Sequence, residues 1–255
     1  DGVIETVIRV VVAPGDKVAV AAPTFSVYGL AAKAASAEIV NIQSKEDFTI
    51  DVDAFIEGAK DAKLSFLCTP NNPTGTTVPA EDVKRILENI SGLLFLDCAY
   101  IEFADEDYYQ LLSFNTLIIG RTLSKVYGLA GLRIGYAFVP EWFVGPYMAG
   151  VTPFSLNCVS EAAGVAALEN PECKDALVSH VRSWRKRFED EIPFPVLPSG
   201  ANFVLINTAP IKSDDAVKQL QKMGILVRSC SSFPGLGETY VRVSIGDDWE
   251  NERFL

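Results

Sequence analysis

A lysine in a short polar run is the clearest candidate for chemistry in this sequence. Lys125 follows Ser124 within the stretch Gly120–Gly135, in a turn expected after the apolar segment Leu117–Ile119, and Arg133 comes eight residues later. A lysine held at the end of a buried strand can lose its hydration, so its amine stays reactive towards a carbonyl carbon. An isolated loop lysine is usually solvated, so the prediction of imine chemistry depends on the residues that accompany this one.

An imine-forming lysine needs specific neighbours if its carbonyl partner is a pyridine aldehyde. A carboxylate must keep the ring nitrogen protonated so that the ring can accept electrons, and Asp97 follows the apolar run Leu93–Leu96. Tyr100 and Asn72 could donate hydrogen bonds to the phenolic oxygen of the ring, and Phe25 could lie on its face. Each residue also has an ordinary structural explanation, such as a turn aspartate or a core aromatic, so the combination carries the argument.

A phosphate on such a ring would need a hydroxyl group, a cation and free backbone amides. Ser124 offers the hydroxyl and Arg133 the cation. The helix expected at Val3–Val12 would present its first N–H groups near Asp1 and Gly2, and Asp1 could also cap that helix.

Apolar strands alternate with helices along the chain, which predicts an α/β fold with a mostly parallel sheet sandwiched between helices. The expected strands are Lys17–Ala22, Glu38–Ile42, Leu64–Cys68, Leu93–Leu96, Leu117–Ile119 and Arg133–Val139, and the expected helices are Val3–Val12, Ser26–Ala35, Asp51–Ala59 and Pro79–Ile90. Ligands bind outside the carboxyl ends of the strands in such sheets. The segments that follow strands, and should therefore converge, are Thr24–Phe25, Asn71–Asn72, Asp97–Tyr100 and Ser124–Lys125.

The last part of the chain predicts a second, smaller α/β unit. Its expected elements are strands at Asn202–Asn207, Ile225–Arg228 and Tyr240–Ile245, a helix at Asp214–Met223 and a final helix from Asp247. A long helix from Cys158 to about Arg187, interrupted near Asn170–Pro171, should precede it. We expect a large domain at 1–155, a connecting helix at 156–190 and a small domain at 191–255.

The composition limits the classes of function. The chain has 255 residues, 49% hydrophobic and 22% charged, which is typical of a globular α/β protein. Its net charge of −11 argues against general binding to nucleic acid or to anionic membranes. The five scattered cysteines indicate reduced thiols in a cytoplasmic protein, and no apolar run has the length of a membrane span. The single histidine, His180, is expected at the surface, so a histidine-based metal centre or Ser-His triad is not expected.

Two other sequence features need an interpretation. Gly128, Gly131 and Gly135 suggest a dinucleotide-binding loop, but such a loop opens a helix, whereas these glycines lead into a predicted strand. The chain begins at Asp1, without methionine, directly in a helical pattern. We therefore expect an N-terminal segment of the protein to be missing from these residues.

The order of the motifs resembles that of the fold-type-I pyridoxal-phosphate enzymes. The shared motifs are Asn-Asn-Pro-Thr-Gly at 71–75, Asp-x-Ala-Tyr at 97–100, Ser-Lys at 124–125 and the arginine at 133. Within that group, the chain is similar to the histidinol-phosphate aminotransferase family from Asp1 to its end. The segments that carry this similarity are Pro23–Ser26 with Tyr28, Ala99–Phe103, Arg121–Lys125, Leu129–Arg133 and Val241–Gly246.

The resemblance implies a role for each candidate residue. It implies Lys125 as the Schiff-base lysine, Asp97 on the pyridine nitrogen, Tyr100 and Asn72 on the ring oxygen, Phe25 as the stacking ring, Ser124, Arg133 and the amides of Asp1 and Gly2 on the phosphate, and Arg228, Arg242 and Asn72 on the substrates. Arg228 could equally be an exposed strand arginine. The implied reaction transfers an amino group between L-histidinol phosphate and 2-oxoglutarate in histidine biosynthesis, with pyridoxal 5′-phosphate, in a cytoplasmic homodimer with a shared active site and with no metal, nucleic-acid or membrane partner.

The chain departs from the family pattern in three places. Cys98 stands where the family usually has glutamate, Phe25 replaces a frequent tyrosine, and the segment that closes over the site and reaches the partner subunit is absent. Related activities stay open: an aminotransferase for aromatic or other amino acids, or a threonine-phosphate decarboxylase. A third alternative is a non-catalytic cofactor-binding domain of a regulator fused to a DNA-binding domain.

Overall fold

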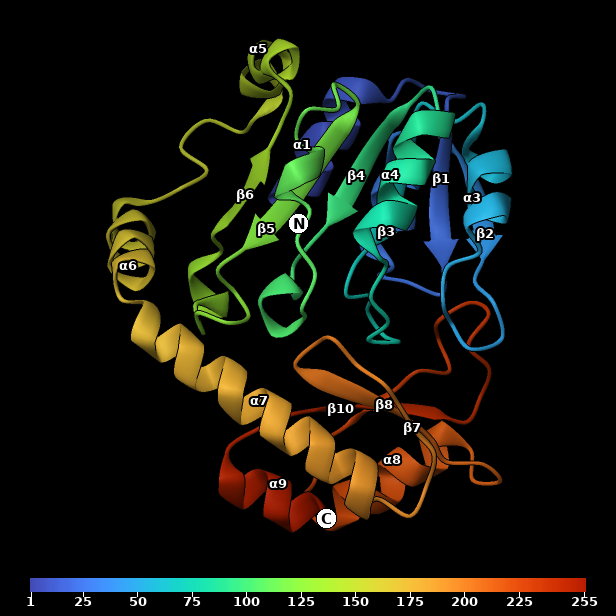
Figure 1. Cartoon of the computed structure of the whole chain (residues 1–255), viewed down its shortest axis with the longest axis vertical. Helices are drawn as coiled ribbons and strands as arrows, with labels where there is room; N and C mark the ends of the chain where they lie inside the picture. Colours follow the sequence, from blue (N-terminus) through green and yellow to red (C-terminus); the bar gives the residue numbers. More distant parts are fainter.

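The computed structural model describes residues 1–255, whose strands form two β-sheets. The larger sheet has the order β2-β1-β3-β4-β5-β6, and all its pairs are parallel except β5 with the antiparallel β6. Its strands are β1 (Lys17–Ala22), β2 (Glu38–Gln43), β3 (Leu64–Cys68), β4 (Leu93–Asp97), β5 (Leu117–Thr122) and β6 (Gly135–Phe138). The prediction of a mostly parallel sheet flanked by helices is confirmed (Figure 1).

The central strands of this sheet are buried on both faces. Consecutive side chains point to opposite sides, so each strand contributes to two hydrophobic clusters. In β4, Leu94 and Leu96 belong to one hydrophobic cluster, whereas Leu93 and Phe95 belong to another. The helices that cover the first face are α3 (Val52–Ala59) and α4 (Ala80–Asn89), and those that cover the second are α1 (Gly2–Val11), α2 (Val27–Ala34) and α5 (Glu141–Gly150). Two covered faces explain why these strands are apolar without alternation.

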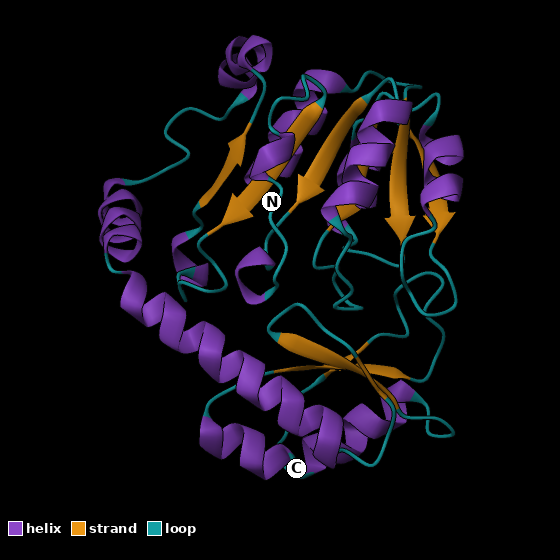
Figure 2. Ribbon diagram, viewed as in Figure 1, coloured by secondary structure: helices purple, strands orange, loops and turns teal.

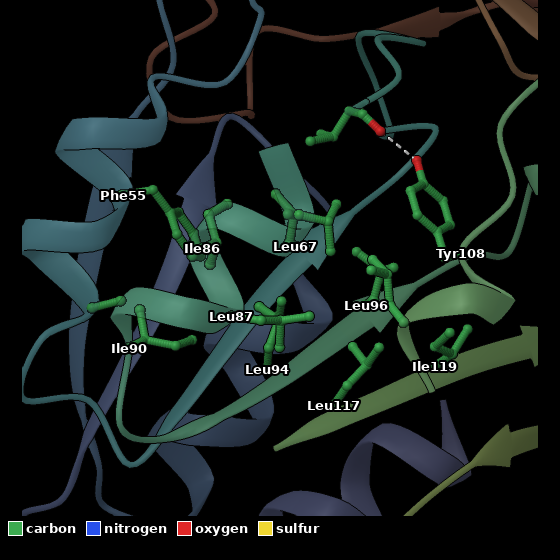
Figure 3. Close-up of a cluster of buried hydrophobic side chains, with 14 of the residues drawn as sticks. Phe55, Leu67, Ile86, Leu87, Ile90, Leu94, Leu96, Tyr108, Leu117 and Ile119 are labelled. Carbon is green, nitrogen blue, oxygen red and sulfur yellow. Dashed lines mark hydrogen bonds between the residues drawn. The ribbon is translucent and has the colours of Figure 1, made fainter. Parts of the chain in front are cut away.

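The first cluster is the larger of the two and is drawn in Figure 3. Phe55 of α3 and Ile86 of α4 pack there against the strands. Tyr108, from the loop after β4, closes one end of the cluster and donates a hydrogen bond of 2.5 Å to the carbonyl of Val78 (Figure 3). Its hydroxyl also lies 2.7 Å from that of Thr69. The loops that follow β3 and β4 are thus joined to each other by Tyr108.

The second sheet has four strands in the order β7-β8-β10-β9, all antiparallel, and lies below the first in Figures 1 and 2. Its elements are β7 (Val196–Leu197), β8 (Phe203–Asn207), α8 (Ser213–Lys222), β9 (Arg228–Ser229), β10 (Tyr240–Ser244) and α9 (Asp248–Phe254). Helix α7 (Pro171–Glu191) runs from the first sheet to the second, where its Trp184 and Phe188 enter the core. A smaller cluster between the sheets contains Tyr100 and Val126, from the loops after β4 and β5, and Phe203 of β8.

The predicted break in the long helix is confirmed. Helix α6 (Cys158–Glu169) ends at Asn170, and α7 starts at Pro171. Proline lacks the N–H that an unbroken helix would use, but it is well tolerated in a first turn. Helix α7 extends four residues beyond the predicted end at Arg187, to Glu191.

Several predicted boundaries in the first sheet are wrong. Strand β5 continues to Thr122, so Gly120 lies in the strand and not in a turn, because it pairs with Ala137 of β6. Arg133 lies outside β6, with a left-handed φ of 56°. Asp1 stands at the N-cap of α1, but its side chain makes no capping hydrogen bond.

Other errors concern short or interrupted elements. Only Arg228 of the predicted strand Ile225–Arg228 is in β9. Helix α5, which has Pro146 inside it, and the two-residue strand β7 were not predicted. His180, expected at the surface, is partly exposed, and its Nε2 lies 2.8 Å from the carbonyl oxygen of Gly246.

Two kinds of feature are absent from the structure. None of the helices combines the length and the apolar character needed to span a bilayer. No group of three or more histidine, cysteine, aspartate or glutamate side chains is arranged to hold a metal ion.

The first cluster should dominate the stability of the larger sheet. Replacing the fully buried Leu94 by alanine should lower the free energy of unfolding by about 2–5 kcal/mol, since it leaves a cavity. The same change at Leu226, which is 81% exposed, should alter it by less than about 0.5 kcal/mol. Urea unfolding monitored by tryptophan fluorescence measures both, and equal losses in the two variants would contradict this placement of the core.

Candidate active site

The expected convergence of strand ends is present in the structure. Strands β1, β3, β4 and β5 are neighbours in the sheet, with Cys68 aligned to Asp97 and Asp97 aligned to Gly120. A cavity of about 540 Å³ opens beyond these ends. The predicted site residues that line it are Asp1, Gly2, Phe25, Asp97, Ser124, Lys125 and Arg133.

The Asp97 carboxylate is almost fully buried, with 8% of the residue exposed. Its Oδ1 accepts a hydrogen bond of 3.1 Å from the backbone N–H of Ala99, and its Oδ2 accepts one of 2.5 Å from the hydroxyl of Tyr28. Burial raises the pKa of Asp97, and the bond from Tyr28 opposes that rise. No lysine, arginine or histidine lies within ion-pair distance of it. Such a group favours a cationic ligand.

The Lys125 amine lies in a half-buried position suited to nucleophilic chemistry. Its Nζ is 5.1 Å from the centre of the Tyr100 ring. Burial lowers the pKa of Lys125 first, and the positive charge of Arg242 lowers it further, while Asp97 acts in the opposite direction. A lower pKa increases the fraction of uncharged amine near neutral pH.

Gly120 forms part of the cavity wall between Asp97 and Lys125. A Cβ atom at this position would lie 2.6 Å from the ring of Phe95, which is too close for any side chain. The strand end can therefore carry only glycine without moving the ring behind it.

Tyr100 and Arg242 meet the same aromatic ring on the second sheet. Tyr100 packs edge-on against Phe203 with ring centres 5.2 Å apart, and the Arg242 guanidinium stacks 4.9 Å from the centre of Phe203. Burial raises the pKa of Tyr100, so its hydroxyl remains a proton donor. The second sheet thus contributes directly to the surroundings of Lys125.

Asn72 connects the two sheets. Its Oδ1 accepts a hydrogen bond of 2.5 Å from Arg242, which leaves its amide Nδ2 as the donor for the predicted role. The buried Nε of Arg242 has no hydrogen-bond partner. The preceding Asn71 holds the neighbouring loop, because its Nδ2 donates 2.8 Å bonds to the Pro23 carbonyl and the Thr74 hydroxyl.

Ser124 is positioned by the threonine two residues before it. The Ser124 N–H donates a 3.1 Å bond to Oγ1 of Thr122, and the two hydroxyls are 2.8 Å apart. This short turn ends β5 and exposes Ser124 and Lys125 to the cavity.

The predicted phosphate-binding groups lie together at one side of the cavity. Arg133 reaches this place from its left-handed turn and forms a 2.6 Å ion pair with the Asp1 carboxylate. The first-turn amides of α1, which begins at Gly2, are not used within the helix. A phosphate at this position would have to compete with Asp1 for the arginine.

Phe25 and Arg228 are the remaining predicted site residues, and only Phe25 lines the cavity. Phe25 lines the cavity and contacts Tyr28 edge to face at 5.7 Å. Arg228 is exposed and lies outside the cavity, but it is directly opposite Arg242 in the β9–β10 pair, so the two side chains share a face of the second sheet.

Cys98, one of the three departures from the family pattern, points away from Asp97 into the first hydrophobic cluster. Beside it, Arg121 and Glu102 form a largely buried ion pair of 2.8 Å. The Nε of Arg121 and the Oε2 of Glu102 are buried without partners. This pair joins the loop that carries Tyr100 to the strand that leads to Lys125.

Four residues that shape the site were not among the predicted site residues. Tyr28, Asn71, Thr122 and Phe203 contact Asp97, the Phe25 loop, Ser124 and Tyr100, respectively. Tyr28 lies in the first turn of α2, three residues after Phe25, so its nearness to this strand end could have been expected. For Phe203, the sequence contains no comparable signal.

The family described as aminotransferase class I and II matches the chain over residues 1–255. A fold with a mostly parallel sheet and a lysine and a buried carboxylate at adjacent strand ends agrees with that match. The chain therefore belongs to the class I and II aminotransferase family.

Several of the most similar proteins are histidinol-phosphate aminotransferases. A histidinol-phosphate aminotransferase of Methanocorpusculum labreanum is 63% identical over 255 residues, which cover all of this chain and 73% of that protein. The crystal structure of the histidinol-phosphate aminotransferase from Clostridium acetobutylicum matches with a TM-score of 0.93 at 26% identity, over 99% of this chain and 78% of that one. The crystal structure of the histidinol-phosphate aminotransferase from Sinorhizobium meliloti, in complex with pyridoxal 5′-phosphate, matches with a TM-score of 0.86 at 26% identity. The match covers 98% of this chain and 71% of that one.

The charge of Arg242 should influence the reactivity of Lys125. Arg242→Gln should raise the pKa of Lys125, so less of its amine is uncharged at neutral pH and its acetylation by acetic anhydride slows. Competitive labelling across a pH series, read by mass spectrometry, measures this pKa. Arg187→Gln, which removes an arginine paired with Glu191 and Glu252, is the matched control. A Lys125 pKa that moves equally in both variants would refute the coupling.

Proposed function

We propose that the protein is a pyridoxal-phosphate-dependent aminotransferase that transfers the amino group of L-histidinol phosphate to 2-oxoglutarate in histidine biosynthesis. The observation that carries this proposal is the presence of Lys125 and the unpaired, buried Asp97 on the wall of one cavity. The identity of 63% to a protein named for the same substrate supports the choice of donor.

The residues around the cavity fit the cofactor. Asp97 is a buried carboxylate without a cationic partner, as expected of a group that faces a protonated pyridine nitrogen. We assign Lys125 to the aldehyde carbon, Asn72 and Tyr100 to the ring oxygen, and Phe25 to the ring face. The proposed phosphate ligands are Ser124, Arg133 and the amides near Asp1 and Gly2.

Pyridoxal phosphate, when bound, draws electrons from the substrate carbon and so stabilises the charge left by proton removal. Lys125 moves the proton at that carbon, and its lowered pKa leaves a larger fraction of the amine uncharged and free to accept that proton. Asp97 keeps a negative charge at the far end of the ring. Tyr100, with its pKa raised by burial, remains a donor throughout.

The second sheet supplies the groups for the anionic ends of the substrates. Arg242 has a buried Nε without a partner and a guanidinium fixed by Phe203 and Asn72. We propose that it binds a substrate carboxylate or phosphate, with Asn72 beside it. Arg228, on the same sheet face, would contribute a second positive charge to that binding.

The protein should convert its cofactor with L-histidinol phosphate more readily than with related amines. Mixing the cofactor-loaded protein with L-histidinol phosphate should convert the bound cofactor to its amine form, seen as a loss of its visible absorbance, and 2-oxoglutarate should restore it. O-phospho-L-threonine and L-phenylalanine serve as competing donors. A faster change with either would contradict the proposed substrate.

Lys125→Ala should bind the cofactor without covalent attachment and lower turnover by at least about a hundredfold, since general acid–base catalysis is lost. Lys84→Ala, at an exposed lysine of α4, is the control and should behave as the unaltered protein. Normal turnover of the Lys125 variant would exclude the assigned role.

We also propose that the protein is a homodimer with a shared active site. Exposed apolar side chains gather on α6 and the loop before it, and among them are Phe154, which is 99% exposed, Val159 and Leu168. In Figure 1, α5 and α6 lie at one edge of the molecule with no element outside them. Leu156 belongs to the same face and lines the cavity, so a second copy seated there would reach the site.

Val159→Asp should convert the dimer to a monomer, because it places a charge in the centre of the apolar face. Sedimentation velocity measures the change. Met223→Asp, at an equally exposed position at the end of α8, is the control and should leave the dimer intact. A monomeric unaltered protein, or a dimeric Val159 variant, would contradict the proposed interface.

Two further features of the molecule are proposals. We propose that residues 1–155, 156–190 and 191–255 form a large domain, a connector and a small domain, because the two sheets share no strand. A cytoplasmic location is supported by the five cysteines, all of which are free thiols.

A further inference from the structure

A buried tyrosine stands behind the carboxylate that faces the cavity. The hydroxyl of Tyr28 donates a 2.5 Å hydrogen bond to Oδ2 of Asp97, and no atom of Tyr28 is exposed. We propose that Tyr28 is a positioning residue that holds the Asp97 carboxylate in the orientation and charge state needed to face the pyridine nitrogen. This inference rests on the role proposed for Asp97 above.

The surroundings of Tyr28 leave its ring a single position. The ring stacks on Phe66 of β3, with centres 4.7 Å apart and planes 9° from parallel. Phe25 also contacts the Tyr28 ring edge to face, with ring centres 5.7 Å apart and planes at 84° to each other. Since a packed aromatic ring cannot rotate without displacing its neighbours, the direction of the hydroxyl is fixed before any ligand arrives.

The two donors to Asp97 divide its carboxylate between them. The N–H of Ala99 contacts Oδ1 at 3.1 Å, and the hydroxyl of Tyr28 contacts Oδ2. Each carboxylate oxygen can accept more than one hydrogen bond, so acceptor capacity remains for the cavity side. With one donor on each oxygen the plane of the carboxylate is set, whereas with Ala99 alone it could turn about its side-chain bonds.

The same bond also affects the charge of Asp97. Burial raises the pKa of this carboxyl group, and the bond from Tyr28 lowers it. Burial also raises the pKa of Tyr28 well above its ordinary value, so the tyrosine keeps its proton and acts as a donor. Without Tyr28, Asp97 would take up a proton at a higher pH, and a protonated Asp97 cannot balance a positively charged ring.

A purely structural role for Tyr28 makes a different prediction. If the tyrosine only fills space between Phe25 and Phe66, its hydroxyl should affect every ligand of the cavity equally. If it acts through Asp97, its effect should depend on the pyridine nitrogen. A cofactor analogue in which a C–H group replaces that nitrogen separates the two cases, because all other contacts are shared.

The experiment compares the equilibrium binding of pyridoxal phosphate and this analogue to the whole protein freed of cofactor, followed by tryptophan fluorescence. The preference is the ratio of the two Kd values. Tyr28→Phe should reduce the preference for pyridoxal phosphate roughly tenfold, since a hydrogen bond to a charged group is worth about that factor. Asp97→Asn should abolish the preference, and adding Tyr28→Phe to it should change the preference no further.

Tyr108→Phe is the matched control. It removes another buried hydroxyl, bonded to the Val78 carbonyl and outside the cavity, so it should lower the unfolding temperature and leave the preference unchanged (Figure 3). An unchanged preference in Tyr28→Phe, or an equal weakening of both ligands, overturns the role of Tyr28. A preference that survives Asp97→Asn instead overturns the role of Asp97, so the two failures are distinguishable.

Discussion

The burial of the Asp97 carboxylate determines most of the arrangement of this site. Asp97 ends a strand that is covered on both faces, so its charge can be tolerated only with donors and a cation close by. Tyr28 and the N–H of Ala99 satisfy part of that need, and the remaining part faces the cavity. The same neighbourhood lowers the pKa of Lys125 by burial, so both reactive groups owe their properties to one dry region.

The second sheet completes this region from outside the first. Arg242 bonds to Asn72, stacks on Phe203 and lowers the pKa of Lys125 across the gap between the sheets. The contact that would recognise a substrate therefore also changes the reactivity of the lysine. A displacement of one sheet relative to the other would change both the position of Arg242 and the pKa of Lys125, so substrate binding and the reactivity of the lysine would change together.

Much of this arrangement could be predicted from the sequence. The parallel sheet follows from apolar strands alternating with helices, and the strand ends then place Asn72, Asp97 and Lys125 at one edge without further information. The roles of such residues depend on their type and on the element that carries them, both of which are visible in a sequence.

What escaped prediction depends on contacts between distant segments. The bond between Tyr28 and Asp97 spans 69 positions, and that between Asn72 and Arg242 spans 170. The left-handed turn at Arg133 is adopted by a residue type that ordinarily avoids it, so local propensity pointed to a strand. The extension of β5 through Gly120 came from pairing with β6, which is a tertiary effect.

Gly120 also bears on how such a site can diversify. Because a Cβ atom there would lie 2.6 Å from the Phe95 ring, position 120 cannot carry a side chain unless that ring moves. Mutations that adapt the site to a new amine must therefore arise at other positions, among them those of the second sheet that contact Tyr100 and Asn72. A lineage of such proteins could change its amino donor through substitutions at those positions, while the residues around the cofactor stayed the same.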